Sequence, residues 1–294
     1  MFWFLGIGVA LSVAIWSVLL GQFGRDKSII SVLFIFSFGF LFLLVAGFIF
    51  QFYSFKHATD ILHNHGLEIG FAGILLFLSF LFRIYANNFM PVGIVIMISG
   101  ALWIISIFIY ELLFLESFPT PVQIILVSLI MISVISLVWI KNESSIRFKD
   151  FSWKGLAGSF MAGACIGTSF GIMTDVSRAT TSFILTPLLW LTAMAFGIYV
   201  AIAVRGVIRR KFASAFTLPQ MAGLSMASLF FVLTGVGFSY AASMGSVTVL
   251  AAIESTSIMM TALIAWFFMG EKLVLKQWTA MCLVTACIIA LKFV

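Results

Sequence analysis

The sequence predicts an all-α integral membrane protein, with ten transmembrane helices arranged as two inverted five-helix repeats. Three observations support this fold class. Hydrophobic residues make up 63% of the 294 residues and charged residues only 9%, whereas about 25% of a soluble domain is charged. Ten apolar runs are long enough to cross a hydrocarbon core, which takes about 20 helical residues. Two stretches 155 positions apart also resemble each other.

Each apolar run is expected to be a helix, because backbone polar groups in lipid must be hydrogen-bonded within the segment. No basic segment precedes the first run, so we expect it to be a retained span and not a removed signal peptide. The longest polar stretch is 141–154, and it divides the chain into a first repeat (1–141), a connecting loop (142–153) and a second repeat (154–294). The predicted spans are 2–22, 29–51, 67–86, 91–113, 122–140, 154–174, 182–204, 219–242, 246–269 and 273–292.

The internal repeat aligns 85–116 with 240–271 without a gap. Each half has five spans, an odd number, so the second half must cross the membrane in the opposite sense. Inverted repeats of this kind are a common plan of secondary transporters. Six identities in the 32 aligned positions pair Tyr85 with Tyr240, Ala86 with Ala241, Val92 with Val247, Ile98 with Ile253, Ile109 with Ile264 and Glu116 with Glu271.

The charges predict an orientation. Thirteen of the sixteen Lys and Arg residues fall at odd-numbered connections, and only Lys56, Arg178 and Lys292 fall on the other side. Because cytoplasmic loops are enriched in Lys and Arg, this places the odd-numbered connections in the cytoplasm and both termini outside. The basic residues do not alternate with aromatic residues on a polar face, so no nucleic-acid partner is expected despite the net charge of +6.

Several features of the second half form a recognisable set: Tyr240-Ala241 ends the eighth span, Glu254 lies in the ninth, and Gly270-Glu271 and Gln277-Trp278 lead into the tenth. This segment resembles the end of an EamA domain of the drug/metabolite transporter superfamily. The resemblance implies a secondary transporter of ten helices in a bacterial inner membrane, and it does not indicate a substrate. The first half has a weaker copy of the set in Arg83-Ile84-Tyr85-Ala86, Ser99, Glu116, Pro119 and Gln123.

The chain departs from that family in three respects. Ser255 follows the acid of the ninth span, where the family often has Pro, and Leu115 stands before Glu116, where the second half has Gly. Family members also usually keep both termini in the cytoplasm, which is opposite to the orientation that the charges predict. The orientation is therefore open between these two indications.

Glu254 is the main candidate for substrate binding. It lies about a third of the way along the ninth span, with no Lys or Arg within a helical turn. An ionised acid near the bilayer centre costs at least about 2.5–3.5 kcal/mol, so we expect Glu254 to be protonated, paired or exposed to a wet cavity. Ser257 and Thr261 share its helix face at i+3 and i+7. A substrate-cation or proton site is one interpretation, and a hydrogen-bonded packing residue is the other.

The fourth span offers a second candidate face of Ser99, Trp103, Ser106 and Tyr110 at 3–4-residue spacing. Ser99 aligns with Glu254 in the repeat, so the two faces are expected to oppose each other near the midplane, where such transporters bind substrate. Aromatic rings beside an acid suit an organic cation. The alternative is that these aromatic residues only pack or anchor the span.

Besides Glu254, four residues are candidates for coupling or gating. Arg83 either snorkels to the interface or pairs with an anionic substrate or an acid such as Glu254. Pro187 removes a helical hydrogen bond and is expected to kink the seventh span. Gly163 and Gly167 belong to a four-residue repeat of small residues that either packs a helix closely or also allows sliding. Glu116 and Glu271 lie beside turns, where capping is the expected role. The complete four-residue repeat of small residues, in the span 154–174, is Gly155, Ser159, Gly163, Gly167 and Gly171.

The segment 56–66 holds His57, Asp60, His63 and His65 between the second and third spans. Such residues can bind zinc, but the spacing matches no known ligand pattern and a solvated interfacial loop is expected. No P-loop, nucleophile elbow or His-Glu-x-x-His motif occurs. The three cysteines lie in apolar runs, where packing is expected and a disulfide is not: they are Cys165, Cys282 and Cys287.

The sequence therefore predicts a transporter that moves a small metabolite, such as an amino acid or organic cation, by alternating access. Proton coupling through Glu254 is a hypothesis based on its lone intramembrane position. Expected partners are the small-molecule substrate and membrane lipids, no metal or other cofactor is expected, and homodimerisation is left open. Two alternatives are a lipid or lipid-linked sugar flippase with an arginine-lined side opening, and an intramembrane enzyme or sensor built on 56–66.

Overall fold

In the computed structural model, the regular secondary structure of the described residues is entirely helical, with no strand among them. The described residues are 1–24, 29–49, 53–90, 92–114, 120–122, 124–126, 128–129, 132–133, 152–209, 216–245, 247–254, 256–269 and 275–291. The helices are α1 (Phe2–Gly24), α2 (Ile29–Ile49), α3 (Phe55–Asn87), α4 (Val92–Phe114), α6 (Trp153–Thr180), α7 (Leu185–Arg209), α8 (Leu218–Ala242), α9 (Val247–Glu254), α10 (Thr256–Met269) and α11 (Leu275–Leu291).

The fold is that of a multi-pass membrane protein. Within the described part of the chain, six helices are long and apolar enough to cross a membrane: α1, α2, α3, α6, α7 and α8. Large apolar side chains such as Phe4, Phe42 and Phe196 point out of the bundle with about 70–80% of their surface exposed. Water would not favour so many exposed apolar groups, so this surface is suited to lipid.

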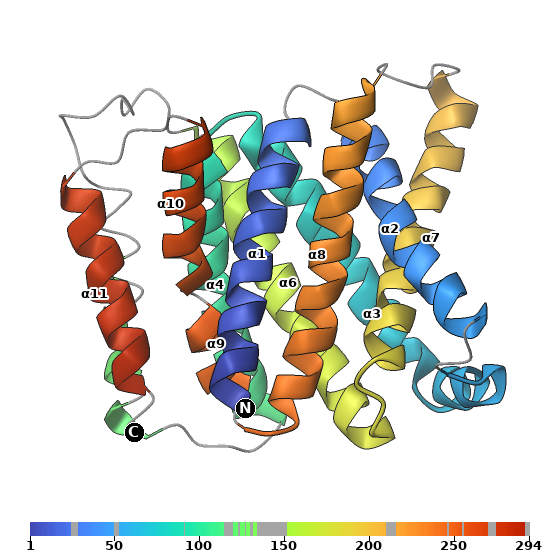
Figure 1. Cartoon of the computed structure of the whole chain (residues 1–294), viewed down its shortest axis with the longest axis horizontal. Helices are drawn as coiled ribbons and strands as arrows, with labels where there is room; N and C mark the ends of the chain where they lie inside the picture. The colour runs from blue at the N-terminus through green and yellow to red at the C-terminus, as the bar shows by residue number, and fades with distance from the viewer. Residues whose placement is uncertain are drawn as a thin grey trace.

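Most predicted spans agree with the helices, and the start of α3 is the main correction. The segment 56–66 is helical and not the expected loop, because Ser54 caps α3 by accepting a hydrogen bond from the backbone N–H of His57 at 3.1 Å. The helix bends at His65, where φ is −128°. Its first turns lie across the lower end of the bundle in Figure 1, with Ala58 and Ile61 buried and Lys56 exposed.

Several predictions fall on residues that the structure does not describe. They include most of the fifth span (122–140), nearly all of the connecting loop (142–153) and the acids Glu116 and Glu271. Ser255, between α9 and α10, is also outside the described residues.

The helices pack as two groups, each drawn from both halves of the sequence. The α3/α6 bundle contains α3, α4, α6 and α7, in which α6 packs on α3 and α4, and α7 packs on α3. The α1/α8 bundle contains α1, α2, α8, α9 and α10, in which α1 packs on α8, α9 and α10, and α2 packs on α8. The two bundles meet mainly where α2 contacts α7 and where α4 contacts α9 and α10.

Figure 1 shows the directions of these helices. Following the colours, α1 and α3 run from the lower end of the bundle to the upper end, whereas α6 and α8 run downward. The first turn of α1 and the last turn of α11 lie at the same lower end, which is called the N-terminal end below.

Close contact within the α3/α6 bundle depends on small residues and buried hydroxyl groups. Ser79 of α3 donates to the carbonyl oxygen of Ala162 at 2.8 Å. Ser169 of α6 donates to the carbonyl oxygen of Ala72 at 2.6 Å and accepts from the indole N–H of Trp190 at 2.8 Å. These bonds join α3, α6 and α7, and the hydroxyl groups of Ser79 and Ser169 that make them are buried.

Candidate functional site

A small cavity lies at the interface between the two bundles. Its volume is about 30 Å³, which is room for about two water molecules. Its side chains come from α1, α3, α4, α6, α8, α9 and α10, so both bundles contribute to it. The lining residues are Val13, Trp16, Arg83, Ser99, Gly100, Trp103, Ile166, Phe170, Phe231, Thr234, Glu254 and Ser257.

Arg83 supplies a positive charge to this cavity from the α3/α6 bundle. Its side chain is buried, with 8% of its surface exposed, so the expectation that it snorkels to the interface is wrong. The guanidinium lies 4.6 Å from the ring centroid of Trp16 and donates to the hydroxyl of Ser17 at 3.2 Å, both on α1. A desolvated cation–π contact is worth about 2 kcal/mol, which partly offsets the cost of burying the charge.

Glu254 faces the same cavity from the α1/α8 bundle. Its side chain is fully buried, and neither carboxylate oxygen has a hydrogen-bond partner. Glu254 and Arg83 are close enough to interact electrostatically. They do not form a salt bridge, since the ion pair within 4.0 Å among the described residues joins His65 and Glu68. A basic and an acidic side chain, contributed by different bundles, therefore line the same small cavity.

The predicted substrate residues are only partly brought together. Ser99, Trp103 and Ser257 line the cavity beside Glu254. Thr261 is buried on α10 without a hydrogen-bond partner, but it is not part of the cavity wall. Ser106 is also absent from the wall, and its hydroxyl donates to the carbonyl oxygen of Leu102 at 2.8 Å within α4.

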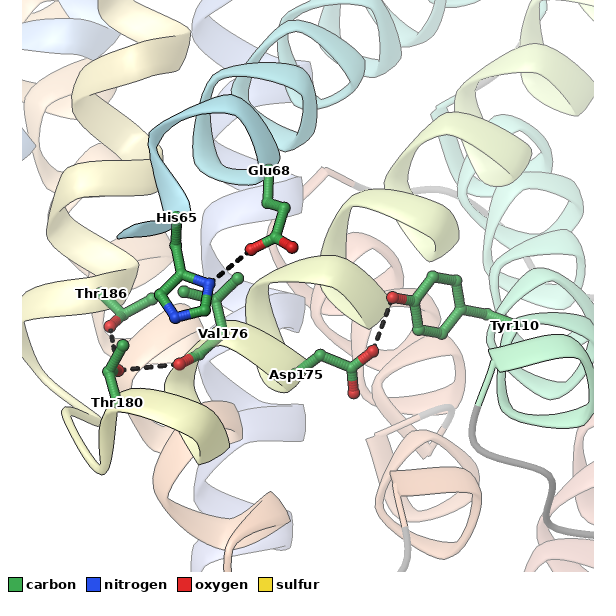
Figure 2. A network of polar contacts seen from close by, with 7 residues as sticks. All are labelled: His65, Glu68, Tyr110, Asp175, Val176, Thr180 and Thr186. Atoms are coloured by element: carbon green, nitrogen blue, oxygen red, sulfur yellow. Dashed lines mark hydrogen bonds and ion pairs between the residues drawn. The ribbon is translucent and has the colours of Figure 1, made fainter. Parts of the chain in front are cut away.

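Tyr110 lies outside the cavity and takes part in a different contact. Figure 2 shows Tyr110 of α4 and Asp175 of α6 pointing toward each other. The phenol donates to the Asp175 carboxylate at 2.6 Å. This bond joins two helices of the same bundle, so it stabilises the α3/α6 bundle from within. Asp175 was not recognised from the sequence, where its only signal is an acid near the end of an apolar run.

The comparisons with known proteins give the fold and no function. No protein-family model matches this chain. No curated protein matches it either. A solved structure titled "Crystal structure of protein" superposes with a TM-score of 0.70 at 11% sequence identity, covering 99% of this chain and 96% of the other. At this identity the similarity shows a shared fold over nearly the whole length of both chains.

Of the candidates for coupling or gating, Gly163, Gly167 and Pro187 do not line the cavity. Gly163 and Gly167 of α6 pack against α4, where a Cβ on Gly163 would lie 2.5 Å from the carbonyl oxygen of Ser99. Pro187 is in the first turn of α7, because that helix begins at Leu185. A first-turn proline removes no helical hydrogen bond, so the expected kink does not follow.

The residues that sequence reasoning missed are mainly aromatic. Trp16 of α1, Phe170 of α6 and Phe231 of α8 form walls of the cavity, and Thr234 adds a hydroxyl from α8. The rings of Trp103 and Phe170 are 5.2 Å apart, and those of Trp16 and Phe231 are 5.1 Å apart. The cavity is therefore a charged gap enclosed by aromatic packing.

At the N-terminal end of the bundle, Arg178 of α6 joins the two bundles. Its guanidinium donates to the carbonyl oxygens of Ala242 at 2.8 Å and Gly245 at 3.1 Å, at the end of α8. This contact is called the Arg178 contact below. Because it links α6 to α8, it must break if the bundles separate at this end.

A larger depression of about 420 Å³ also lies at this end, and His57 is part of its wall. The other residues of the predicted histidine cluster do not form a metal site: across the described ranges, no three His, Cys, Asp or Glu side chains converge. His65 instead pairs with Glu68 at 2.6 Å, as Figure 2 shows. The cysteines Cys165, Cys282 and Cys287 are free.

Proposed function

We propose that this protein is a secondary transporter that moves a small polar metabolite across the membrane by alternating access. The observation that carries the proposal is the cavity between the bundles, with the buried Arg83 on one side and the buried Glu254 on the other. Ionisable groups are expensive inside a membrane, and they are typical of substrate and ion pathways. A site that both bundles share can open to either side of the membrane as the bundles rock.

The packing of the helices supports two inverted repeats of the EamA type. Exchanging the halves replaces α3 by α8, α4 by α9 and α10, α6 by α1 and α7 by α2. The contacts of α3 with α6 and α7 then become those of α8 with α1 and α2. The contact of α4 with α6 becomes that of α9 and α10 with α1. All of these contacts are present. The opposite directions of α1 and α6 in Figure 1 agree with this symmetry. In the ten-span plan predicted from the sequence, 122–140 is paired with the span that contains α11.

In this scheme the moving units are the two bundles and not the two halves of the sequence. The tightest packing joins helices of different halves, such as α3 with α6 and α1 with α8. Rocking of one sequence half against the other would break these contacts. Rocking of the α3/α6 bundle against the α1/α8 bundle changes only the smaller interface that contains the cavity.

Alternating access can be tested by labelling a cavity residue. We expect Ser257→Cys to react with a membrane-impermeant maleimide from both sides of the membrane in reconstituted vesicles, because the cavity opens to each side in turn. The variant is made with Cys282→Ala, which removes the exposed cysteine. Cys165 and Cys287 stay as buried internal controls that do not react, and mass spectrometry identifies the labelled site.

Breaking the Arg178 contact sharpens the same experiment. Arg178→Gln loses the donor to the end of α8, so labelling of Ser257→Cys from the N-terminal end is expected to rise several-fold. Lys276→Gln removes an exposed positive charge of α11 and serves as the control. Labelling of Ser257→Cys from one side only, under all conditions and in both backgrounds, contradicts alternating access.

Glu254 is the proposed proton-coupling residue. Its carboxylate faces the cavity without a hydrogen-bond partner, and the charged group that faces it from the other packed elements is Arg83. A solute is first selected for thermal stabilisation from a panel of amino acids, amines and carboxylic acids. Glu254→Gln is then expected to abolish the acceleration of its uptake by a pH gradient in liposomes, and unchanged acceleration rules out coupling through this residue.

The structure offers less support for a lipid flippase. Such a protein needs a side opening lined by basic residues such as Arg83 or Arg178. Arg83 is buried in the cavity and Arg178 is engaged by the end of α8. Both arginines therefore serve the interface between the bundles.

A further inference from the structure

We propose that the substrate is a small zwitterion whose ammonium group is held by Glu254 and whose carboxylate is held by Arg83. This inference rests on the proposed transport function and adds the substrate class. It begins from one small cavity that the basic side chain of Arg83 lines from one bundle and the acidic side chain of Glu254 lines from the other. An arginine stays positively charged in a protein, so the cavity always presents a cation to whatever enters.

A substrate with one charge does not match this cavity. An organic cation would be attracted to Glu254 but would be buried together with Arg83, a like charge. An organic anion would meet the same difficulty with an ionised Glu254. Burial of an uncompensated charge is costly, whereas a zwitterion brings one opposite charge to each wall and leaves no charge without a partner.

The hydrogen-bonding atoms of the cavity wall that have no partner also match the two charged groups of a zwitterion. Both carboxylate oxygens of Glu254 are acceptors without a donor, and an ammonium group supplies three donors. The indole N–H groups of Trp16 and Trp103 are buried donors without an acceptor. Trp16 also stacks on Arg83, so this corner of the cavity is rich in donors and suits a carboxylate.

The remaining wall restricts the third substituent of the substrate. Val13, Ile166, Phe170 and Phe231 are apolar and buried, so an aliphatic or aromatic side group fits and a third charge does not. The cavity of about 30 Å³ is far smaller than the roughly 300–1,000 Å³ of ordinary ligand pockets. The structure therefore represents a closed state, and binding requires the bundles to move apart.

The test uses three probe sets, each of which compares an amino acid with the amine that lacks its carboxylate and the acid that lacks its ammonium group. Alanine is compared with ethylamine and propionate, leucine with isoamylamine and 4-methylpentanoate, and phenylalanine with phenethylamine and 3-phenylpropionate. Thermal unfolding of the purified full chain is measured with each probe at the same concentration, because a ligand that binds the folded state raises the Tm. We expect at least one zwitterion to raise the Tm, and its amine and acid partners to have no such effect.

Variants assign the two charges. Arg83→Gln and Glu254→Gln are each expected to weaken binding of the active zwitterion at least about 30-fold, which corresponds to the loss of one buried charge contact. The double variant Arg83→Gln/Glu254→Gln has no unpaired charge, so it keeps the fold if a single variant does not, and it too is expected to lose binding.

Each other outcome overturns the zwitterion assignment. An amine that stabilises the protein as well as its amino acid, with binding kept in Arg83→Gln, identifies a cationic substrate. An acid that does so, with binding kept in Glu254→Gln, identifies an anionic one. If no probe stabilises the protein, the assignment fails, while labelling of Ser257→Cys from both sides still supports transport. Labelling from one side only removes the transport function itself.

Discussion

The double variant Gly163→Ala/Gly167→Ala is expected to lose about 2–6 kcal/mol of folding free energy, since overpacking costs about 1–3 kcal/mol at each site. A Cβ on Gly163 would lie 2.5 Å from the Ser99 carbonyl oxygen, and one on Gly167 would lie 2.7 Å from that of Trp103. Both neighbours are backbone atoms of α4, so a side chain cannot rotate away to make room. Thermal unfolding in detergent measures the loss.

The matched control is Gly8→Ala on α1. Gly8 is exposed and nothing lies within 4 Å of the position that a Cβ would take there, so alanine is expected to be neutral or to gain up to about 1 kcal/mol from helix propensity. A double variant as stable as the unmodified protein would show that α4 does not approach α6 so closely.

The same variant separates packing from sliding. Because α4 and α6 belong to one bundle, the glycine contacts should be kept while the bundles rock. We therefore expect the ratio of Ser257→Cys labelling from the two sides to stay the same in Gly163→Ala/Gly167→Ala. A changed ratio with unchanged stability would instead make this stripe a sliding surface.

The positions of most helices could be predicted because the length of an apolar run determines where a chain can cross lipid. The expected span 91–113 differs from α4 by one residue at each end, and 219–242 differs from α8 by one residue at its start. The start of α3 could not be predicted in this way. Its first turns carry Lys56, His57 and Asp60, and the Ser54 cap and the burial of Ala58 hold them in a helix where no apolar run exists.

The polar part of the candidate site could be predicted, but its aromatic walls could not. Glu254 and Ser99 stand out in apolar runs, where each polar group needs a reason. Trp16, Phe170 and Phe231 do not stand out among 34 Phe and 8 Trp residues. They are brought together by the packing of α1 on α8 and by the contact between bundles, which joins residues far apart in the sequence.

Arg83 illustrates the limit of local reasoning. A position three residues before the predicted end of a span suggests snorkelling. In the structure, Trp16 and Ser17 of α1 hold its guanidinium inside the bundle. Local sequence does not indicate this partner, because α1 and α3 belong to different bundles and make only limited contact.

The two single variants of the cavity, Glu254→Gln and Arg83→Gln, are expected to lose unequal amounts of folding free energy. In Glu254→Gln, Arg83 keeps its charge and loses its electrostatic partner, so a cost of about 3–5 kcal/mol is expected for breaking a buried pair. In Arg83→Gln, the carboxyl group that remains can be neutralised by a proton, and the cost is therefore expected to be smaller. Thermal unfolding of the two variants, at one pH near neutrality and without added solute, measures the difference.

The double variant Arg83→Gln/Glu254→Gln completes this comparison. It removes both charges from a cavity of about 30 Å³, and replacing a buried pair by neutral groups is often neutral or stabilising. We therefore expect its Tm to be close to that of the unmodified protein and above that of both single variants. If the single variants are equally stable and the double variant loses the sum of their costs, the two charges do not interact across the cavity, because independent sites are additive. A Tm of the double variant close to that of the unmodified protein instead means that the pair does not stabilise the fold. This is expected of residues that are retained to bind a substrate.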